Sequence, residues 1–240
     1  MKLINDTILI TGGSSGIGLE MAKQLLALGN TVIVTGRNKE KMNQAKEQYP
    51  KLHTYSVEVT DIDSIQDLYE QVTRDFPTLN VLINNAGMMN AIKFQTAKAK
   101  GIADEVNTNL AGPILMTQIF LPHLLQQKEA AILNVNSGIA YFAFDKAPIY
   151  SASKLGLHSY TQSLRKQLKK TPVKVFELAP PRTSKPMFSG TEEDNASVDR
   201  VPEVPISEVV RKMIDGIKKN RETIVPGMSK LLKLVGKIQL

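Results

Sequence analysis

Residues 7–29 read TILITGGSSGIGLEMAKQLLALG. The first five residues form a short apolar run rich in β-branched side chains, which favour a β-strand. A glycine-rich turn follows, and helix-forming residues continue from 16 to 28. Strand, glycine turn and helix in this order predict a phosphate-binding turn, because the open N–H groups at the amino terminus of a helix attract anions.

Each glycine of the turn has a separate task in this prediction. Gly12 makes the tight turn, Gly16 lets the backbone approach a pyrophosphate, and Gly18 allows close packing of helix on strand. Glycines also mark ordinary turns, so the triplet alone is weak evidence. The strand before it and the helix after it favour the nucleotide site.

A second pattern lies in the middle of the chain, where NVNSGIAY precedes YSASK. Tyr150 and Lys154 are four residues apart, which puts them on one face of a helix over residues 148–169. A neighbouring ammonium lowers the pKa of a phenol from its usual value of about 10, so that the tyrosine exchanges a proton during catalysis. The hydroxyl of Ser137, on the preceding strand, would hold a substrate oxygen. The alternative is a solvated helix face, since Tyr-x-x-x-Lys occurs by chance in many chains.

Apolar runs and helical segments alternate along the whole chain. Strands are expected at 7–11, 31–35, 52–57, 80–84, 130–136, 172–178 and 223–225. Helices are expected at 16–28, 38–48, 61–75, 99–127, 148–169 and 206–217. Short apolar runs such as VLIN and AILNV are typical of strands that helices cover on both faces. The alternation predicts one α/β domain over residues 1–240, a Rossmann-type doubly wound parallel sheet of about seven strands.

The composition excludes several classes of protein. The chain has 240 residues, of which 42% are hydrophobic and none is cysteine, so disulfide and thiolate chemistry are excluded. No His/Cys cluster has the spacing of metal ligands. The net charge is +7, but the basic residues are spread over several helical segments, and no nucleic-acid recognition motif is present. No apolar run approaches a membrane span and the chain begins close to its first strand, so we expect a cytoplasmic protein.

Together these motifs resemble the short-chain dehydrogenase/reductase family from about Asp6 to the carboxyl terminus. The matching stretches are TGGSSGIG at 11–18, NNAG at 84–87, NLAG at 109–112, and Ser137 with Tyr150 and Lys154. The amino-acid sequences of several segments also resemble the bacterial subgroup encoded beside teichoic-acid D-alanylation genes. The resemblance implies hydride transfer between a nicotinamide cofactor and a small carbonyl or alcohol substrate.

The resemblance also implies roles for four residues. Tyr150 would be the general acid in reduction and the base in oxidation. Lys154 would lower the pKa of the tyrosine and hold the nicotinamide ribose, and Ser137 would hydrogen-bond the substrate oxygen. Asn109 would position a water that connects Lys154 to solvent; the alternative for Asn109 is an amide that braces a helix kink.

Further residues are expected to contact the cofactor by the same resemblance. They are Gly12, Ser14, Ser15, Gly16, Ile17, Gly18, Arg37, Glu58, Val59, Asn85, Ala86, Gly87, Pro180 and Thr183. Glu58 replaces the aspartate that commonly meets the adenine amino group. Pro181 replaces a glycine, and Lys185 stands where a threonine usually holds the carboxamide, so Thr183 is the expected substitute.

The end of the second strand bears on the choice of cofactor. NAD sites usually place a carboxylate there for the ribose 2′-hydroxyl, whereas this chain has Gly36 followed by Arg37. Arg37 is suited to pair with a 2′-phosphate, which favours NADP(H). The alternative is a solvent-facing arginine, and Ser15 stands where many NADP-preferring relatives carry a basic residue. NAD(H) therefore remains the second candidate.

The remaining expectations concern the lid and the assembly. Residues 183–205 are polar and hold three prolines, and in the family this segment covers the substrate. The expected helices at 99–127 and 148–169 pair between subunits in the family, which predicts a homodimer or homotetramer. Both carry apolar positions beyond what one sheet face needs, including Ile114, Leu115, Ile119, Leu157 and Tyr160. Residues 228–240 form a short amphipathic segment, expected to pack on protein more than on lipid.

Other interpretations are weighed against the enzyme. His123 and His158 are expected to be satisfied core or interface histidines, because no second histidine stands near either. A regulator that senses NADP without turnover and an envelope-associated accessory protein are the two alternative functions. All four catalytic positions are present, which favours the enzyme.

Overall fold

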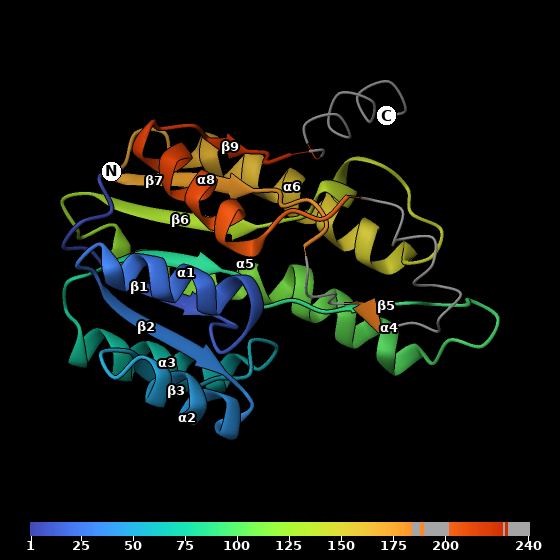
Figure 1. The fold of residues 1–240 in the computed structure, drawn as a ribbon, viewed down its shortest axis with the longest axis horizontal. Coiled ribbons are helices and arrows are strands. Elements are labelled where there is room, and N and C mark those ends of the chain that lie inside the picture. Colours follow the sequence, from blue (N-terminus) through green and yellow to red (C-terminus); the bar gives the residue numbers. More distant parts are fainter. Residues whose placement is uncertain (184–187, 190–201, 228, 230–240) are drawn as a thin grey trace.

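The structure is a computed structural model that describes residues 1–183, 188–189, 202–227 and 229. Seven parallel strands form one sheet in the spatial order β3-β2-β1-β4-β6-β7-β9 (Figure 1). These strands are β1 (Thr7–Thr11), β2 (Thr31–Gly36), β3 (His53–Ser56), β4 (Leu79–Asn84), β6 (Ala130–Val135), β7 (Val173–Leu178) and β9 (Thr223–Ile224). From β1 the chain adds strands towards one edge of the sheet, and from β4 it adds them towards the other edge. Ligands of such sheets bind outside the carboxyl ends of the strands at this switch point.

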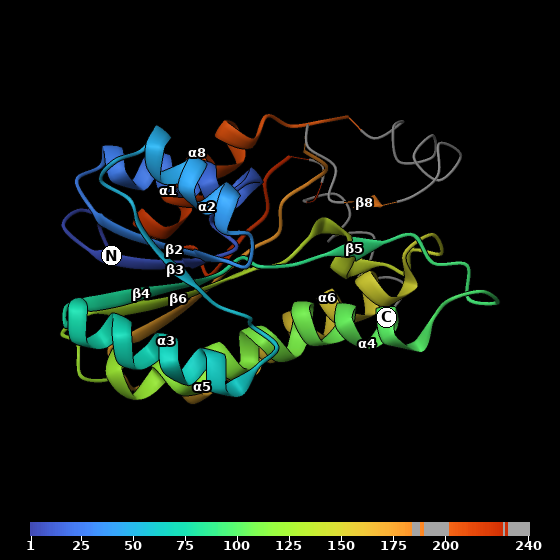
Figure 2. The same ribbon diagram turned by 90° about the horizontal axis from the view of Figure 1, so that it is seen from below.

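Helices cover both faces of the sheet, as Figure 2 shows. One face is packed by α1 (Gly16–Ala27), α2 (Lys39–Gln48) and α8 (Ile206–Lys218). The other face is packed by α3 (Ile62–Asp75), α5 (Gly112–Leu124) and α6 (Pro148–Gln167). The expected Rossmann-type architecture is therefore confirmed.

Alternate residues of each strand enter opposite cores. In β1, Ile8 and Ile10 belong to the core beneath α1 and α8, whereas Leu9 belongs to the core beneath α3 and α5. All five residues of β1 are buried. A strand covered on both faces needs apolar side chains at successive positions, which is why short continuous apolar runs located these strands in the sequence.

One expected helix is interrupted at a position that matters for the site. The segment expected as a continuous helix at 99–127 consists of α4 (Ala99–Val106), a π-helical turn η1 (Asn107–Ala111) and α5. Pro113 has no N–H, so the α-helical hydrogen bond to the carbonyl of Asn109 cannot form. Such π turns inside helices are frequently found at functional sites.

Short elements that the sequence analysis did not anticipate lie beyond the carboxyl ends of the strands. A 3₁₀ turn, η2 (Gly138–Tyr141), follows β6, and β5 (Met89–Asn90) pairs in parallel with β8 (Phe188–Ser189). Most of the expected lid at 183–205 and nearly all of the expected amphipathic segment at 228–240 lie outside the described residues. Within the described ranges, no helix has the length and apolarity needed to cross a membrane.

Candidate active site

The glycine turn leaves open space in front of α1. Gly12 and Gly16 have φ angles of 64° and 55°, which residues with a side chain rarely adopt. A Cβ atom built on Gly16 would meet no described atom within 4 Å. Ser15 precedes α1 in an extended conformation, and its side chain makes no capping hydrogen bond to the described first turn. The N–H groups of that turn are therefore left open to a phosphate, and phosphate binding there stays a prediction.

Asn85 ties the glycine turn to the end of β4. Its Nδ2 donates to the carbonyl oxygens of Thr11 and Gly12 at 2.9 and 3.1 Å. A Cβ atom on Gly18 would lie 2.6 Å from the same Nδ2 and would also collide with the Gly12 carbonyl oxygen. Gly18 thus permits close packing of α1 on the turn and on Asn85, rather than on a strand. The side-chain N–H groups of Asn85 support the turn, so cofactor contact by this residue stays a prediction.

The residues expected to contact the adenosine part of the cofactor lie together at the carboxyl ends of β2 and β3. Arg37 Nη1 lies 3.2 Å from Glu58 Oε2, and the arginine side chain is 68% exposed. Glu58 Oε1 also accepts from the N–H and hydroxyl of Thr60. A Cβ atom on Gly36 would lie 3.3 Å from Ser14 Oγ. Val59 is buried, and its carbonyl oxygen faces the start of α5. An ion pair between Arg37 and Glu58 was not foreseen.

The residues expected to perform catalysis meet at the carboxyl end of β6. Tyr150 and Lys154 are 5% and 3% exposed on α6. Lys154 Nζ donates to the Val135 carbonyl oxygen at 2.9 Å and lies 5.7 Å from the centroid of the Tyr150 ring. Ser137 follows β6 immediately, and its Oγ accepts from Ile139 N at 3.2 Å. The spacing of Tyr150 and Lys154 therefore corresponds to one buried face of a helix, and not to a solvated one.

Burial controls the protonation states of this pair. Burial raises the pKa of Tyr150 to about 12; a hydrogen bond with Ser137 lowers it in part, and the charge of Glu105 raises it further. Burial also lowers the pKa of Lys154 to about 8. The expected fall in the tyrosine pKa is wrong in sign, because the phenol has lost its surrounding water and the ammonium of Lys154 is directed at the Val135 carbonyl oxygen.

Asn109 connects α4 and α5 to the loop after β4 and to α6. Its Oδ1 accepts from Met88 N at 2.9 Å, and its Nδ2 donates to Met88 O at 2.8 Å and to Ser153 Oγ at 3.3 Å. This agrees with the alternative reading of Asn109 as an amide that braces a kinked helix. The side chain is engaged by these partners, so the described contacts do not test the expected water-positioning role of Asn109. That role stays a prediction.

Glu105 is a buried residue near the site that sequence reasoning missed. It is 0% exposed, and its carboxylate accepts from Asn90 Nδ2 at 3.0 Å and from Asn90 N at 3.4 Å. Burial raises the pKa of Glu105, while the hydrogen bonds from Asn90 lower it in part. The available signal was its position four residues before Asn109, which puts an acid on the same helix face as an expected catalytic residue.

The segment after β7 reaches the same region. Pro180 O accepts from Gly138 N at 2.9 Å, directly beside Ser137. Thr183 forms a bridge with Val204, so its expected contact with the carboxamide is not tested by the described contacts. Ala86 N donates to Thr11 Oγ1 at 3.0 Å, and Gly87 follows in the same loop. Lys185 lies outside the described residues.

Comparison with known proteins agrees with this arrangement. The family model of the short chain dehydrogenases matches residues 6–196. The uncharacterized oxidoreductase DltE of Bacillus subtilis is 40% identical over 226 residues, which cover 93% of this chain and 89% of the relative. An uncharacterized oxidoreductase of Staphylococcus epidermidis is 30% identical over 192 residues, covering 80% of this chain and 84% of the relative.

Solved structures resemble the chain over nearly all of its length. A short-chain dehydrogenase/reductase from Burkholderia phymatum in complex with NAD has a TM-score of 0.88 at 19% identity, covering 100% of this chain and 96% of the other. A short-chain dehydrogenase from Burkholderia cenocepacia in complex with NADP has a TM-score of 0.83 at 21% identity, covering 98% and 93%. At this identity the likeness concerns the fold. With the family match over residues 6–196 and the B. subtilis relative at 40% identity, the chain belongs to the short-chain dehydrogenase family of oxidoreductases.

Proposed function

We propose that the chain reduces a carbonyl compound to an alcohol, with NADPH as the favoured cofactor. The observation that carries this proposal is the buried Tyr150 beside Ser137 and Lys154. With a pKa of about 12, the phenol keeps its proton at neutral pH, and an alkoxide forming beside it is basic enough to take that proton. The same phenol would act as a base in the reverse reaction, which this pKa disfavours.

The turn at residues 12–16 and the first turn of α1 would hold the pyrophosphate of the cofactor, because they leave N–H groups facing open space. The bound nicotinamide would supply the hydride for the carbonyl carbon. Tyr150 would pass its proton to the carbonyl oxygen as negative charge develops there, and Ser137 would donate a hydrogen bond to that oxygen. The charged form of Lys154 would stabilise the phenolate left on Tyr150.

Replacing Tyr150 with phenylalanine tests the proton donor. Tyr150→Phe keeps the buried ring and removes only the hydroxyl, so we expect turnover to fall by about 10²-fold or more while NADPH binding stays near that of the wild type. NADPH oxidation with a panel of carbonyl compounds and a fluorescence titration of NADPH would measure the two quantities. Tyr160→Phe is the matched control on the same helix. Wild-type rates in Tyr150→Phe would exclude the mechanism, and binding without turnover in the wild type would favour the NADP-sensing alternative.

The pH dependence of reduction tests the state of Lys154. Its lowered pKa means that the ammonium loses its proton as the pH rises through about 8, whereas Tyr150 stays protonated up to about 12. We therefore expect kcat/KM for NADPH to fall above about pH 8, since this parameter reports the free enzyme. Lys154→Arg keeps its charge and should move the fall to higher pH. A fall at the same pH in Lys154→Arg would assign it to another group.

The preference for NADPH rests on the groups around Gly36. A glycine at this position leaves no carboxylate to repel a 2′-phosphate, and a Cβ atom built on it would meet Met42 Sδ at 3.1 Å and Ser14 Oγ at 3.3 Å. Arg37 is paired with Glu58 at 3.2 Å, so a phosphate would have to compete with that carboxylate for the guanidinium. We propose that Glu58 moderates the preference, which makes NADH the weaker but usable alternative.

Substitutions of the two partners should act in opposite directions. Arg37→Ala removes one charge-assisted contact and should raise the Kd of NADPH about tenfold, or roughly 1.5 kcal/mol, the lower end for such contacts because the pair is exposed. Glu58→Gln frees the guanidinium and should lower the Kd of NADPH. Neither change should move the Kd of NADH, and Arg74→Ala, an exposed arginine on α3, serves as control. Equal losses for both cofactors in Arg37→Ala would show a structural role.

We also propose that the chain forms a homodimer or homotetramer through α5 and α6. Leu155 on α6 is 37% exposed, and Ile114, Leu115 and Tyr160 are partly exposed. Two residues that the sequence analysis counted on this surface are buried in the core of the monomer instead, Ile119 and Leu157. The apolar surface available for pairing is therefore smaller than the sequence indicates.

Light scattering tests the assembly. We expect a mass that is a multiple of 26.5 kDa, and Leu155→Glu should shift it towards the monomer because a carboxylate would be buried at the interface. Ile4→Glu changes an exposed apolar residue at the amino terminus and should leave the mass unchanged. A wild-type mass of 26.5 kDa at micromolar concentration would contradict the proposal.

A further inference from the structure

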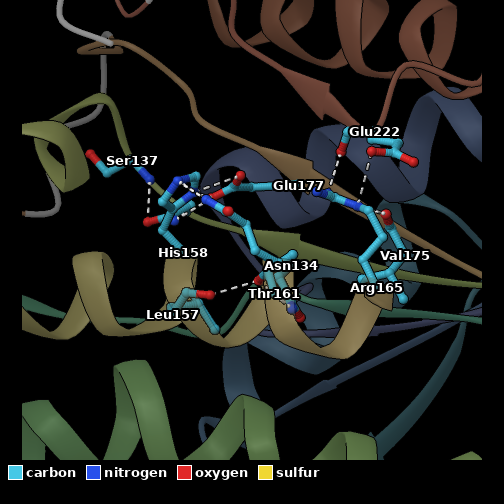
Figure 3. A network of polar contacts seen from close by, with 11 residues as sticks. Asn134, Ser137, Leu157, His158, Thr161, Arg165, Val175, Glu177 and Glu222 are labelled. Carbon is cyan, nitrogen blue, oxygen red and sulfur yellow. Dashed lines mark hydrogen bonds and ion pairs between the residues drawn. The ribbon is translucent and has the colours of Figure 1, made fainter. Parts of the chain in front are cut away.

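Glu177 is a buried carboxylate near the carboxyl end of β7. It is 0% exposed and stands in β7 opposite Asn134 of β6 and Thr223 of β9. Figure 3 shows its side chain directed at His158 on α6. An ionised group without solvent is strongly destabilising unless it is paired and hydrogen-bonded. The contacts of Glu177 therefore indicate what this charge is for.

Three hydrogen bonds converge on the carboxylate. His158 Nδ1 lies 2.8 and 2.9 Å from the two oxygens of Glu177, and Asn136 Nδ2 donates to Oε1 at 2.6 Å. His158 stands one helical turn after Lys154 on α6, so it lies on the same face as the catalytic pair. The Tyr141 ring packs edge-on against the imidazole, with centroids 5.2 Å apart. The carboxylate of Glu177, the amide of Asn136 and the rings of His158 and Tyr141 thus restrain one another.

Asn136 extends this network to the catalytic serine. Asn136 Oδ1 accepts from the N–H of Ser137 at 2.9 Å. The neighbouring N–H groups donate to strand or loop carbonyls, Asn136 N to Leu178 O at 2.7 Å and Gly138 N to Pro180 O at 2.9 Å. Of these three successive N–H groups, only that of Ser137 is held by a side chain. Its orientation therefore depends on which way the amide of Asn136 points.

A carboxylate determines that direction because it is purely an acceptor. Asn136 can satisfy Glu177 only by presenting its NH₂ group, which turns its carbonyl oxygen towards Ser137. A neutral amide at position 177 would accept or donate, and would allow either orientation of Asn136. The Nδ1–H of His158 lies against both oxygens of the carboxylate and restrains its rotation. The charge of Glu177 therefore sets the polarity of the whole chain of hydrogen bonds.

We propose that Glu177 and His158 form a positioning pair that, through Asn136, aims the Ser137 peptide and its hydroxyl at the substrate oxygen. This inference rests on the proposed function, in which Ser137 holds that oxygen. Neither residue touches the reacting atoms. Both act by fixing the serine, and a misplacement of about 1 Å in such a group costs about 10²-fold in rate.

The first test replaces the charge with a neutral amide of the same shape. Glu177→Gln should lower kcat for carbonyl reduction about tenfold to a hundredfold and leave the Kd of NADPH unchanged. Glu222→Gln is the matched control, because Glu222 is a neighbouring carboxylate, 67% exposed, that pairs with Arg165. An unchanged kcat in Glu177→Gln, or an equal loss in Glu222→Gln, would overturn the proposal.

A pair of substitutions at His158 separates positioning from general stability. His158→Asn keeps an N–H donor near the place of Nδ1 and should retain most of the rate, whereas His158→Leu removes the donor and should match the loss in Glu177→Gln. Equal rates in the two variants, high or low, would contradict the proposal. In the Ser137→Ala background, Glu177→Gln should cause no further loss under single-turnover conditions, since interacting residues are not additive. A full additional loss would show that Glu177 acts by another route.

A measurement without turnover keeps the inference distinct from the proposed function. Hydrogen exchange at the Ser137 amide, followed with ¹⁵N-serine label, should accelerate in Glu177→Gln and in His158→Leu but not in Glu222→Gln or His158→Asn. If the wild-type chain reduces no carbonyl compound, the proposed function fails while this measurement still decides the positioning network. Unchanged exchange in Glu177→Gln would overturn the network itself.

Discussion

The hydroxyl of Thr11 at the end of β1 accepts the N–H groups of Asn85 and Ala86, both at 3.0 Å. The amide of Asn85 in turn holds the carbonyls of Thr11 and Gly12. This reciprocal contact joins the two central strands where the chain departs to opposite halves of the sheet. This contact holds in place the glycine turn, the start of α1 and the loop in which Met88 bonds to Asn109. Removing either partner would loosen the glycine turn and the loop after β4 together.

Burial is the second constraint, and it acts on charges as well as on apolar groups. Tyr150, Lys154, Glu105 and Glu177 are all nearly inaccessible to water. Each of these side chains has a hydrogen-bond donor or acceptor as its partner, because an unpaired ionisable group would destabilise the fold. The two carboxylates act on different members of the site: Glu105 raises the pKa of Tyr150, whereas Glu177 reaches Ser137 through Asn136.

The sequence was sufficient for features that depend on local pattern. Short apolar runs located the strands of the parallel sheet, and a four-residue spacing located Tyr150 and Lys154 on one helix face. Features that depend on neighbours distant in the chain were not accessible. Arg37 meets Glu58 because β2 and β3 are adjacent strands, and Glu177 meets His158 because α6 crosses β7. The spacing of two residues predicts how close they lie but not how exposed they are to solvent. For this reason the pKa of Tyr150 was expected to fall and is raised instead.

These shifts set the protonation states from which the proposed chemistry starts. A phenol with a pKa of about 12 is fully protonated at neutral pH and gives its proton only to a strongly basic oxygen, while a lysine with a pKa of about 8 is partly neutral there. Bringing an anion close to Lys154 would favour its charged form, and the charged form would in turn stabilise a phenolate on Tyr150. Where two groups interact in this way, substitution of either one alters the titration of the other.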